Sequence, residues 1–293
     1  MSRSLQSAAP GRGRRPGRGM GRRKRAGRDT RKALPFLLLS MTGVAVFALF
    51  PFFDAVGRTK GLAVYREVLA NRAFRLAAGN TARFMGTALP LLMAVSFFLA
   101  LLVSRSCKKS RFFKTVLVLP AAVPAAGVAL LWKMVFCGDG IVNRLAGLSV
   151  DWIHGSQSFA VLVFAYLWKN TGYQMLLWLA ALAAIPDELY EAAEVDGAGE
   201  FRKLIHITLP QVRRASGMIL FLAVINSFKV FREAYIVAGP YPHERIYMLQ
   251  HLFNHWFLNL EIEKMSAAAV MLTACIVGTM GVSALLPRML KRR

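Results

Sequence analysis

Long apolar runs recur along the chain and restrict what it can fold into. Each run is about 20 residues long, the length that a helix needs to cross the hydrocarbon core of a bilayer. Of the 293 residues, 56% are hydrophobic, too many for an ordinary soluble domain of this size. The sequence therefore predicts an all-α, polytopic membrane protein with six transmembrane helices. The expected spans are residues 34–53, 84–103, 115–136, 159–185, 215–238 and 265–286.

Positive charges are distributed unevenly around these spans. Cytoplasmic loops of membrane proteins carry an excess of Lys and Arg, so the charges report orientation. If both ends of the chain lie inside, 25 of the 38 Lys and Arg residues fall on the cytoplasmic side and 9 on the outside. The bias predicts a multi-pass protein of the cell membrane with cytoplasmic N- and C-termini.

The stretch between the first two spans departs from this pattern. Residues 58–83 hold six cations on the side where few are expected. Apolar side chains recur among them, which predicts a helix lying along the outer interface of the membrane. Residues 34–83 are therefore expected to form the first transmembrane helix and an outer interfacial loop.

A basic tail precedes the first span. Residues 1–33 contain twelve cations, with Gly and Pro among them and almost nothing apolar. This composition predicts a disordered cytoplasmic tail that sets the orientation of the chain. The formal net charge of +23 is also typical of nucleic-acid-binding proteins, but the tail has no aromatic side chain to stack on a base. We therefore expect no nucleic-acid partner.

A polar loop, residues 186–210, separates the fourth and fifth spans. Its apolar residues recur at helical spacing in two short stretches, and Gly197 between them supplies the freedom to turn. We expect Asp187 to cap the first helix. We expect Pro210 to end the second, because proline lacks an amide hydrogen and clashes with the preceding turn. The charge bias places the polar loop in the cytoplasm.

The polar loop carries a pattern of acidic, small and apolar residues at fixed distances. A Glu-Ala-Ala triplet is followed by a glycine and then by Ile-x-Leu-Pro. This pattern resembles the EAA loop of binding-protein-dependent ABC importer permeases. The matching residues are Glu191, Ala192, Ala193, Gly197, Ile207, Leu209 and Pro210. An amphipathic loop with no partner is the alternative interpretation of the same residues.

The resemblance continues outside the polar loop and covers residues 34–290. Matching positions elsewhere are Asn80, Thr81, Leu119, Pro120, Pro124, Trp132, Gly140, Asn143, Gly172 and Tyr173. Within the family the chain is most similar to the maltose-type, carbohydrate-importing branch. Glu263 and Ala238 depart from the pattern, since relatives usually have glycine there. Residues 84–290 are thus expected to form an ABC importer transmembrane domain.

The resemblance implies a task and a set of partners. It implies the transmembrane permease subunit of an ABC importer that moves a carbohydrate, such as an oligosaccharide or glycoside, across the membrane. It also implies a second homologous permease subunit, an ABC ATPase dimer that uses ATP and Mg²⁺, and an extracytoplasmic solute-binding protein. The residues implied in docking the ATPase are Glu191, Ala192, Ala193, Asp196, Gly197, Ile207, Leu209 and Pro210.

Two other interpretations stay open at this point. In the first, the chain is a permease of the same architecture that imports another solute, such as a polyamine or glycerol phosphate. Alternatively, the chain is a non-transporting membrane scaffold that holds its basic tail near nucleic acid or anionic lipid.

The residue types needed for catalysis are not arranged for it. The phosphate-binding pattern G-x-x-x-x-G-K-[ST] is absent, so we expect ATP hydrolysis to belong to a separate subunit. No nucleophile, base and acid occur together, which predicts that the chain is not an enzyme and has no cofactor of its own. His251 and His255 have the spacing of two metal ligands on one helix face, but no third ligand accompanies them. Surface histidines of an outer loop are the alternative. The three cysteines lie far apart, so no disulfide framework is expected.

Polar side chains within the spans mark the expected path of the solute. A charge or amide that faces lipid is costly, so such groups tend to line a water-filled cavity. Packing is the alternative for each, because Asn and Ser also hold neighbouring helices together and lysines extend to the interface. The candidates are Lys169, Asn170, Tyr173, Gln174, Asn226, Ser227 and Lys229.

Overall fold

The computed structural model describes residues 37–59, 61–105, 110–228 and 230–290. Every regular element in these residues is helical, so the all-α prediction is confirmed for them. The tail expected at residues 1–33 lies outside them. The chain divides into two compact units, Met1–Gly57 and Arg58–Arg293.

The described part of the first unit is an apolar helix that runs from Leu37 to Arg58, the first residue of the second unit. It contains a π-helical turn, Ala45–Leu49, followed by α2, Phe50–Arg58. The helix thus overlaps the predicted span of residues 34–53 and continues five residues beyond it, through Pro51.

Three helices among the described residues are long and apolar enough to cross a membrane. They are Leu37–Arg58, Arg72–Ser104 and Ala126–Ala146, and Phe112–Ala122 is a shorter apolar helix. These helices agree with a multi-pass membrane protein. The total of six spans and the side on which each terminus lies stay predictions.

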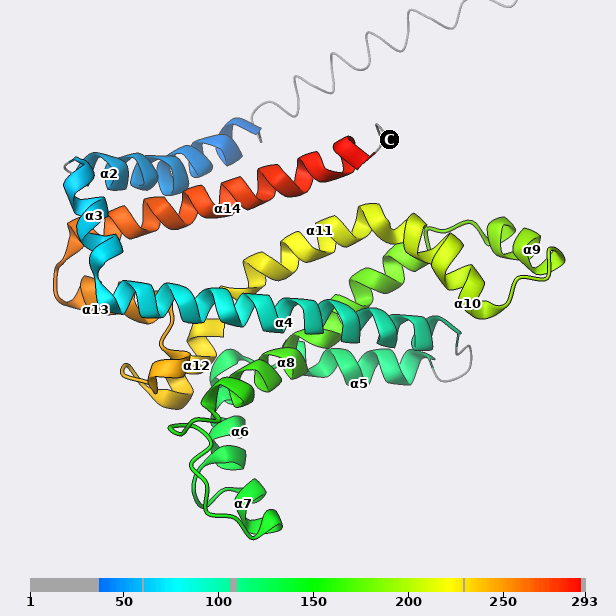
Figure 1. Ribbon diagram of the computed structural model, residues 1–293, viewed down its shortest axis with the longest axis horizontal. Helices are drawn as coiled ribbons and strands as arrows, with labels where there is room; N and C mark the ends of the chain where they lie inside the picture. The colour runs from blue at the N-terminus through cyan, green and yellow to red at the C-terminus, as the bar shows by residue number, and fades with distance from the viewer. Residues whose placement is uncertain (1–36, 60, 106–109, 229, 291–293) are drawn as a thin grey trace, which may run out of the picture. The chain divides into compact units, whose positions relative to one another are not determined.

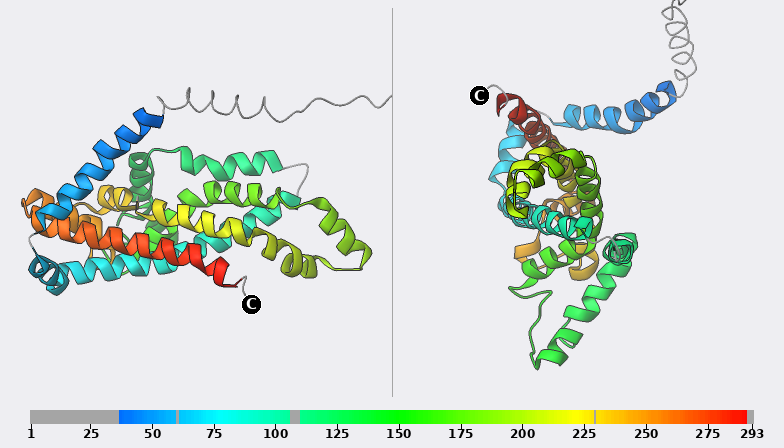
Figure 2. Two further views of the ribbon diagram at one scale, coloured as in Figure 1. Left: turned by 90° about the horizontal axis from the view of Figure 1, so that it is seen from above. Right: turned by 90° about the vertical axis from the view of Figure 1, so that its right-hand side faces the viewer.

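The second unit consists of helices joined mostly by short connections (Figure 1). Figures 1 and 2 show α9 and α10 extending beyond the neighbouring ends of α4 and α5. Its helices in chain order are α3 (Leu62–Ala70), α4 (Arg72–Arg105), α5 (Ser110–Ala122), α6 (Ala125–Phe136), α7 (Ile141–Ala146), α8 (Ser158–Leu182), α9 (Asp187–Val195), α10 (Glu200–Lys203), the π turn η2 (Leu204–Thr208), α11 (Leu209–Ser227), α12 (Val230–Ala238), the 3-10 turn η3 (Glu244–Ile246), α13 (Leu249–Leu258) and α14 (Ile262–Leu290).

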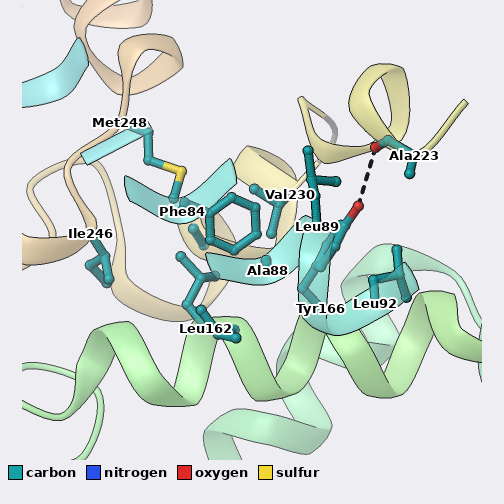
Figure 3. Packing of buried hydrophobic residues seen from close by; sticks show 12 residues of the cluster. Phe84, Ala88, Leu89, Leu92, Leu162, Tyr166, Ala223, Val230, Ile246 and Met248 are labelled. Carbon is teal, nitrogen blue, oxygen red and sulfur yellow. Dashed lines mark hydrogen bonds between the residues drawn. The ribbon is translucent and has the colours of Figure 1, made fainter. Parts of the chain in front are cut away.

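Helix α8 lies at the centre of this unit. It packs against α4, α5 and α11, and it is apolar nearly all round, as expected for a helix with neighbours on several sides. Phe84 of α4 and Tyr166 of α8 share one buried core (Figure 3). The Tyr166 hydroxyl donates to the carbonyl oxygen of Ala223 in α11 (3.4 Å), which ties the third helix to the first two.

Helices α8 and α5 approach each other closely at Gly172. A Cβ atom at this position would lie 1.8 Å from the carbonyl oxygen of Leu117 and 2.8 Å from the amide nitrogen of Val118. A residue without a side chain is needed where two backbones come this near. The glycine of the family pattern therefore has a packing reason here.

Two predicted spans are interrupted. The third is divided between α5 and α6 at Pro124, the N-cap of α6, because proline disfavours a helical conformation for the residue before it. The fifth is divided between α11, which ends at Ser227, and α12, which begins at Val230.

The second span is longer than predicted. Helix α4 begins at Arg72, because the Asn71 side chain accepts hydrogen bonds from the amides of Ala73 (2.8 Å) and Phe74 (3.2 Å) and so caps the helix. Helix α3 lies in the stretch for which an interfacial helix is expected, so the helical part of that prediction is confirmed.

Candidate functional site

The polar loop begins with α9. Pro186 is the N-cap, and no side chain of this helix makes a capping hydrogen bond. The prediction that Asp187 caps the helix is wrong, because Asp187 already belongs to the first turn. There it lies with Glu188 near the unpaired amides of the helix N-terminus, where a negative charge contributes about 0.3–1 kcal/mol.

Gly197 ends α9 and turns the chain. Its φ of +73° lies in the left-handed region. The Gly197 amide donates to the carbonyl oxygen of Glu194 (3.0 Å) and the Ala198 amide to that of Ala193 (2.9 Å), the two bonds of a Schellman motif. The predicted turn at Gly197 is confirmed. Backbone conformation rather than space requires the glycine, since a Cβ atom would meet nothing within 4 Å.

The second limb of the polar loop is continuous with the fifth span. Helix α10 passes into the π turn Leu204–Thr208 and then into α11 without a break. The prediction that Pro210 ends the second helix is therefore wrong. Proline normally breaks a helix because its ring presses on the carbonyl group one turn earlier. The wider π turn just before Pro210 gives that carbonyl group more room.

Lys203 joins the two limbs of the polar loop. Its side chain is 7% exposed, and Nζ donates to Oε1 of Glu194 in α9 (2.6 Å) and to Oε1 of Glu200 in α10 (3.0 Å). The hydrogen bond to Glu194, followed by that to Glu200, raises the pKa of Lys203, so its ammonium group is charged at neutral pH. Sequence reasoning missed this cluster. Glu200 and Lys203 are three residues apart, which is the spacing of an ion pair on one helix face. The second ion pair, with Glu194 of α9, depends on how the loop folds.

Tyr190 anchors α9 to the start of the fifth span. Its hydroxyl group is hydrogen-bonded to the Thr208 hydroxyl (3.0 Å). Its ring lies with Ile207 at the edge of a core that contains Trp178 of α8 and Val212 of α11. The polar loop is thus fixed to both helices that it connects.

The surface of the polar loop is partly apolar. Val195 is 89% exposed and Phe201 is 73% exposed, and Glu191, Ala192 and Asp196 are exposed beside them in the sequence. Two large apolar side chains exposed in a charged loop make this face a candidate for binding another protein. Phe201 is one of the apolar residues that recur at helical spacing in the loop, and sequence reasoning did not recognise it as a site residue.

A cavity of about 530 Å³ lies between the polar loop and the ends of α4, α5 and α8. Ser104, Lys114 and Leu179 line it from these helices, and Tyr190 and Lys203 line it from the loop. The loop is therefore held at its edges rather than by continuous packing.

Residues 86–293 match the family described as binding-protein-dependent transport system inner membrane component. The chain belongs to this family. The match begins in α4 and includes the whole polar loop, so the resemblance found in that loop is confirmed. The chain is thus an inner membrane component of a binding-protein-dependent transport system, which is a transport subunit and not an enzyme.

Named relatives of this permease align over most of its length. The sn-glycerol-3-phosphate transport system permease protein UgpA of Yersinia pestis is 29% identical over 271 residues, which cover 84% of this chain and 90% of UgpA. The xylose/arabinose import permease protein XacH of Haloferax volcanii is 30% identical over 266 residues, which cover 85% of this chain and 84% of XacH.

Solved structures share the fold of the permease. A chain of a bacterial ABC transporter involved in the import of the acidic polysaccharide alginate aligns with a TM-score of 0.78 at 20% identity, over 90% of this chain and 99% of that chain. The bacterial alginate transporter in complex with an alginate pentasaccharide-bound periplasmic protein aligns with a TM-score of 0.76 at 19% identity, over 89% and 97% of the two chains.

Two of the polar candidates in the spans are buried against neighbouring backbone. Gln174 is 1% exposed, and its Nε2 donates to the carbonyl oxygen of Ile219 in α11 (3.3 Å). Ser227 is 3% exposed, and its hydroxyl donates to the carbonyl oxygen of Val224 in the same helix (2.6 Å). In this structure both side chains stabilise the helices of the permease.

The other polar candidates are more accessible. Tyr173 is 39% exposed, and Lys169 and Asn170 are half-buried on the same helix, where Asn170 Nδ2 donates to the carbonyl oxygen of Tyr166 (2.9 Å). Asn226 is half-buried in α11. Lys229 lies outside the described residues.

The histidine pair of the permease lies in α13, between the fifth and sixth predicted spans. His251 is completely buried, so the surface-histidine interpretation is wrong for it. Burial, with a smaller effect of His255, lowers the pKa of His251 to about 4, and the ring is therefore neutral at pH 7. His255 Nδ1 is hydrogen-bonded to the Tyr247 hydroxyl (2.9 Å).

Among the described residues, no three His, Cys, Asp or Glu side chains gather to hold a metal ion, and Cys137 and Cys275 are free thiols.

Proposed function

We propose that this permease is a subunit of an ABC importer and that a separate ATPase docks on the polar loop. Membership of the transport family supports the importer, and the exposed apolar surface at Val195 and Phe201 supports the docking site. Glu191 and Asp196 add negative charge to this surface, and the small side chain of Ala192 lets the ATPase approach closely. Gly197 supplies the turn, and Ile207, Leu209 and Pro210 connect it to the fifth span.

The proposed importer contains further subunits. These are a second homologous permease, an ABC ATPase dimer that uses ATP and Mg²⁺, and an extracytoplasmic solute-binding protein. The periplasmic protein bound to the alginate transporter supports the last of these. We place the permease in the cell membrane with six spans and with both termini in the cytoplasm, in agreement with the distribution of Lys and Arg.

In the proposed mechanism, ATP draws the two ATPase subunits together and the docked polar loop moves with them. A nucleotide shifts the transporter only by favouring one of its two states, so the loop must transmit that preference without deforming. The ion pairs of Lys203 hold α9 and α10 together as one piece. One end of this piece continues into α11, and residues 183–186 join the other end to α8. Tilting of α8 and α11 would switch the cavity from inward to outward facing.

The docking proposal is tested by removing the apolar part of the exposed surface. The double substitution Val195→Ser and Phe201→Ser leaves the Gly197 turn and the Lys203 ion pairs in place. Burial of side chains of this size contributes about 1.5–3 kcal/mol each. We therefore expect the ATPase recovered when the permease is purified from membranes to fall by at least about tenfold.

The matched control is Leu145→Ser in α7. Leu145 is 85% exposed but lies outside the polar loop, so this variant should recover the ATPase as the wild type does. Undiminished recovery with the double variant at equal expression would show that the ATPase does not bind this surface.

We propose a carbohydrate as the solute, because the names of XacH and of the alginate transporter specify sugars. A phosphorylated polyol is the second candidate, because the name of UgpA specifies sn-glycerol 3-phosphate. Calorimetry on the associated solute-binding protein separates them. Binding of pentoses or oligosaccharides supports the carbohydrate, whereas binding of sn-glycerol 3-phosphate alone would replace it.

The proposed path of the solute follows the accessible polar side chains. Lys169, Asn170 and Tyr173 present a polar stretch of α8, and Asn226 adds an amide from α11. Amides suit the hydroxyl groups of a sugar, and the ring of Tyr173 suits its apolar face.

A further inference from the structure

The segment between α12 and α13 is held by side chains of α4. Asn80, which is buried, donates from Nδ2 to the carbonyl oxygens of Glu244 and Tyr247, the latter at 2.9 Å. The neighbouring Thr81 hydroxyl accepts a hydrogen bond from the amide of Leu249 (3.2 Å). Two adjacent residues of α4 thus bind three backbone groups of the segment, which gives this Asn-Thr pair of the family pattern a structural role.

Apolar contacts fix the same segment. The side chains of Ile246 and Met248 belong to the buried core that contains Phe84 of α4 (Figure 3). Helix α4 therefore supplies both polar and apolar contacts to the start of α13, and the apolar core also includes residues of α8 and α12.

The next residue along the chain reaches a different helix. Gln250 of α13 donates from Nε2 to the carbonyl oxygen of Phe228 (2.6 Å). Phe228 is the C-cap of α11, and carbonyl groups at a helix end have no partner within the helix. Gln250 therefore attaches α13 to the point where the fifth span is interrupted.

Helix α11 is the continuation of the polar loop. Its 19 residues form a rod of about 28 Å that runs from the end of the π turn to Phe228 (Figure 1). A displacement of the polar loop therefore reaches Phe228 through a single helix. Helix α4, which holds the other side of the segment, is not continuous with the polar loop.

We propose that Gln250 is a positioning residue that transmits movement between the polar loop and α13. This inference rests on the proposed function, because an ATPase must move the loop. When α11 is displaced, Gln250 carries α13 with it, while Asn80 and Thr81 keep the preceding residues on α4. In the opposite direction, contact of a solute-binding protein with α13 is passed along α11 to the ATPase.

The test uses the assembled importer with its ATPase, second permease and solute-binding protein in lipid nanodiscs. Gln250→Met removes the amide donor at nearly constant side-chain volume. We expect the stimulation of ATP hydrolysis by solute-loaded binding protein to fall by at least about fivefold, because the variant loses the hydrogen bond that attaches α13 to Phe228. Basal hydrolysis and the melting temperature should stay close to those of the wild type.

Hydrogen exchange of the α13 amides supplies a second measurement that a purely structural role would not affect. In the wild type, a non-hydrolysable ATP analogue should change this exchange, and in Gln250→Met it should not. Gln211→Met is the matched control, since Gln211 lies exposed near the other end of α11 and should behave as the wild type.

Two results would overturn the inference. One is a variant that keeps both the stimulation and the nucleotide response of α13. The other is a parallel loss of basal hydrolysis, stimulation and melting temperature, which would reduce Gln250 to a packing role. A wild-type permease that recruits no ATPase would instead contradict the proposed function itself.

Discussion

Gly172 determines how near two helices come, and its replacement should have a measurable cost. The methyl group in Gly172→Ala would overlap the Leu117 carbonyl group, so α5 must move away from α8. Overpacking of this kind costs about 1–3 kcal/mol. We expect a lower melting temperature of the purified permease, measured by a thermal aggregation assay in detergent.

Gly86→Ala in α4 is the matched control. A Cβ atom there would meet nothing within 4 Å, so the higher helix propensity of alanine should leave the melting temperature unchanged or raise it, by at most about 1 kcal/mol in stability. Equal melting temperatures of the two variants would contradict the close approach at Gly172.

For single residues, the sequence predicts the local backbone conformation better than it predicts whether a side chain is buried. The turn at Gly197 was predictable because the bonds of a Schellman motif lie within a few residues. The burial of Lys203 was not, because it requires α9 to fold back against α10. The exposure of Phe201 was not predictable either, since an apolar residue at helical spacing has the same pattern whether its face meets a core or another protein.

Proline has two different effects on the helices of this chain. Pro51 and Pro210 each lie within a continuous helix, two residues after a π turn, Ala45–Leu49 and Leu204–Thr208 respectively. Pro124 divides two helices. The helix end predicted at Pro210 was wrong because the π turn before it gives the proline ring more room than an α turn would. Pro90 and Pro120 also lie inside helices, α4 and α5, so the position of a proline alone does not predict a helix end.

The interruption of the fifth span had no comparable signal. No glycine or proline lies between Ser227 and Val230, and the carbonyl group at the break is bonded by Gln250, more than twenty residues away. A break that depends on such a distant partner cannot be predicted from a local pattern.

Two adjacent residues of α8 should differ in their effects on transport. Tyr173→Leu removes an accessible ring and hydroxyl group from the proposed solute path, so the solute concentration for half-maximal uptake should rise several-fold at unchanged melting temperature. Gln174→Leu removes a buried hydrogen bond to α11, worth about 0.5–1.5 kcal/mol, so the melting temperature should fall while that concentration stays the same. The opposite pair of results in uptake and melting experiments would exchange the roles assigned to the two residues.

For the whole molecule, the orientation in the membrane is open to direct measurement. Single cysteines at Val195 and Leu145 lie in connections that the charge distribution assigns to opposite sides. With the native cysteines replaced by serine, a membrane-impermeant maleimide applied to intact cells without an outer wall should label Leu145→Cys and not Val195→Cys. Inside-out vesicles should give the reverse. Labelling of Val195→Cys in intact cells would place the polar loop outside and contradict the docking proposal.

Composition and spacing were sufficient to predict the all-α membrane class and the transport family. Hydrophobic length identifies a span because the bilayer sets a minimum, and the EAA pattern identifies the family because its residues occur at fixed distances. The same signals do not show how one helix packs on another. The connections of Asn80 and Gln250 to distant backbone are tertiary contacts between residues whose order along the chain gives no hint of proximity.

The π turn Leu204–Thr208 has a consequence for how this chain tolerates changes in length. A π turn accommodates one residue more than an α turn, and each residue rotates a helix by about 100°. A one-residue deletion here would restore a regular helix and leave Phe201 facing nearly the same direction, because the π turn already absorbs the extra residue. A one-residue deletion within the regular part of α11 would instead rotate Phe201 by about 100° about the axis of that helix. One-residue deletions should therefore be tolerated better in this short stretch than in the regular turns of α11 that follow it.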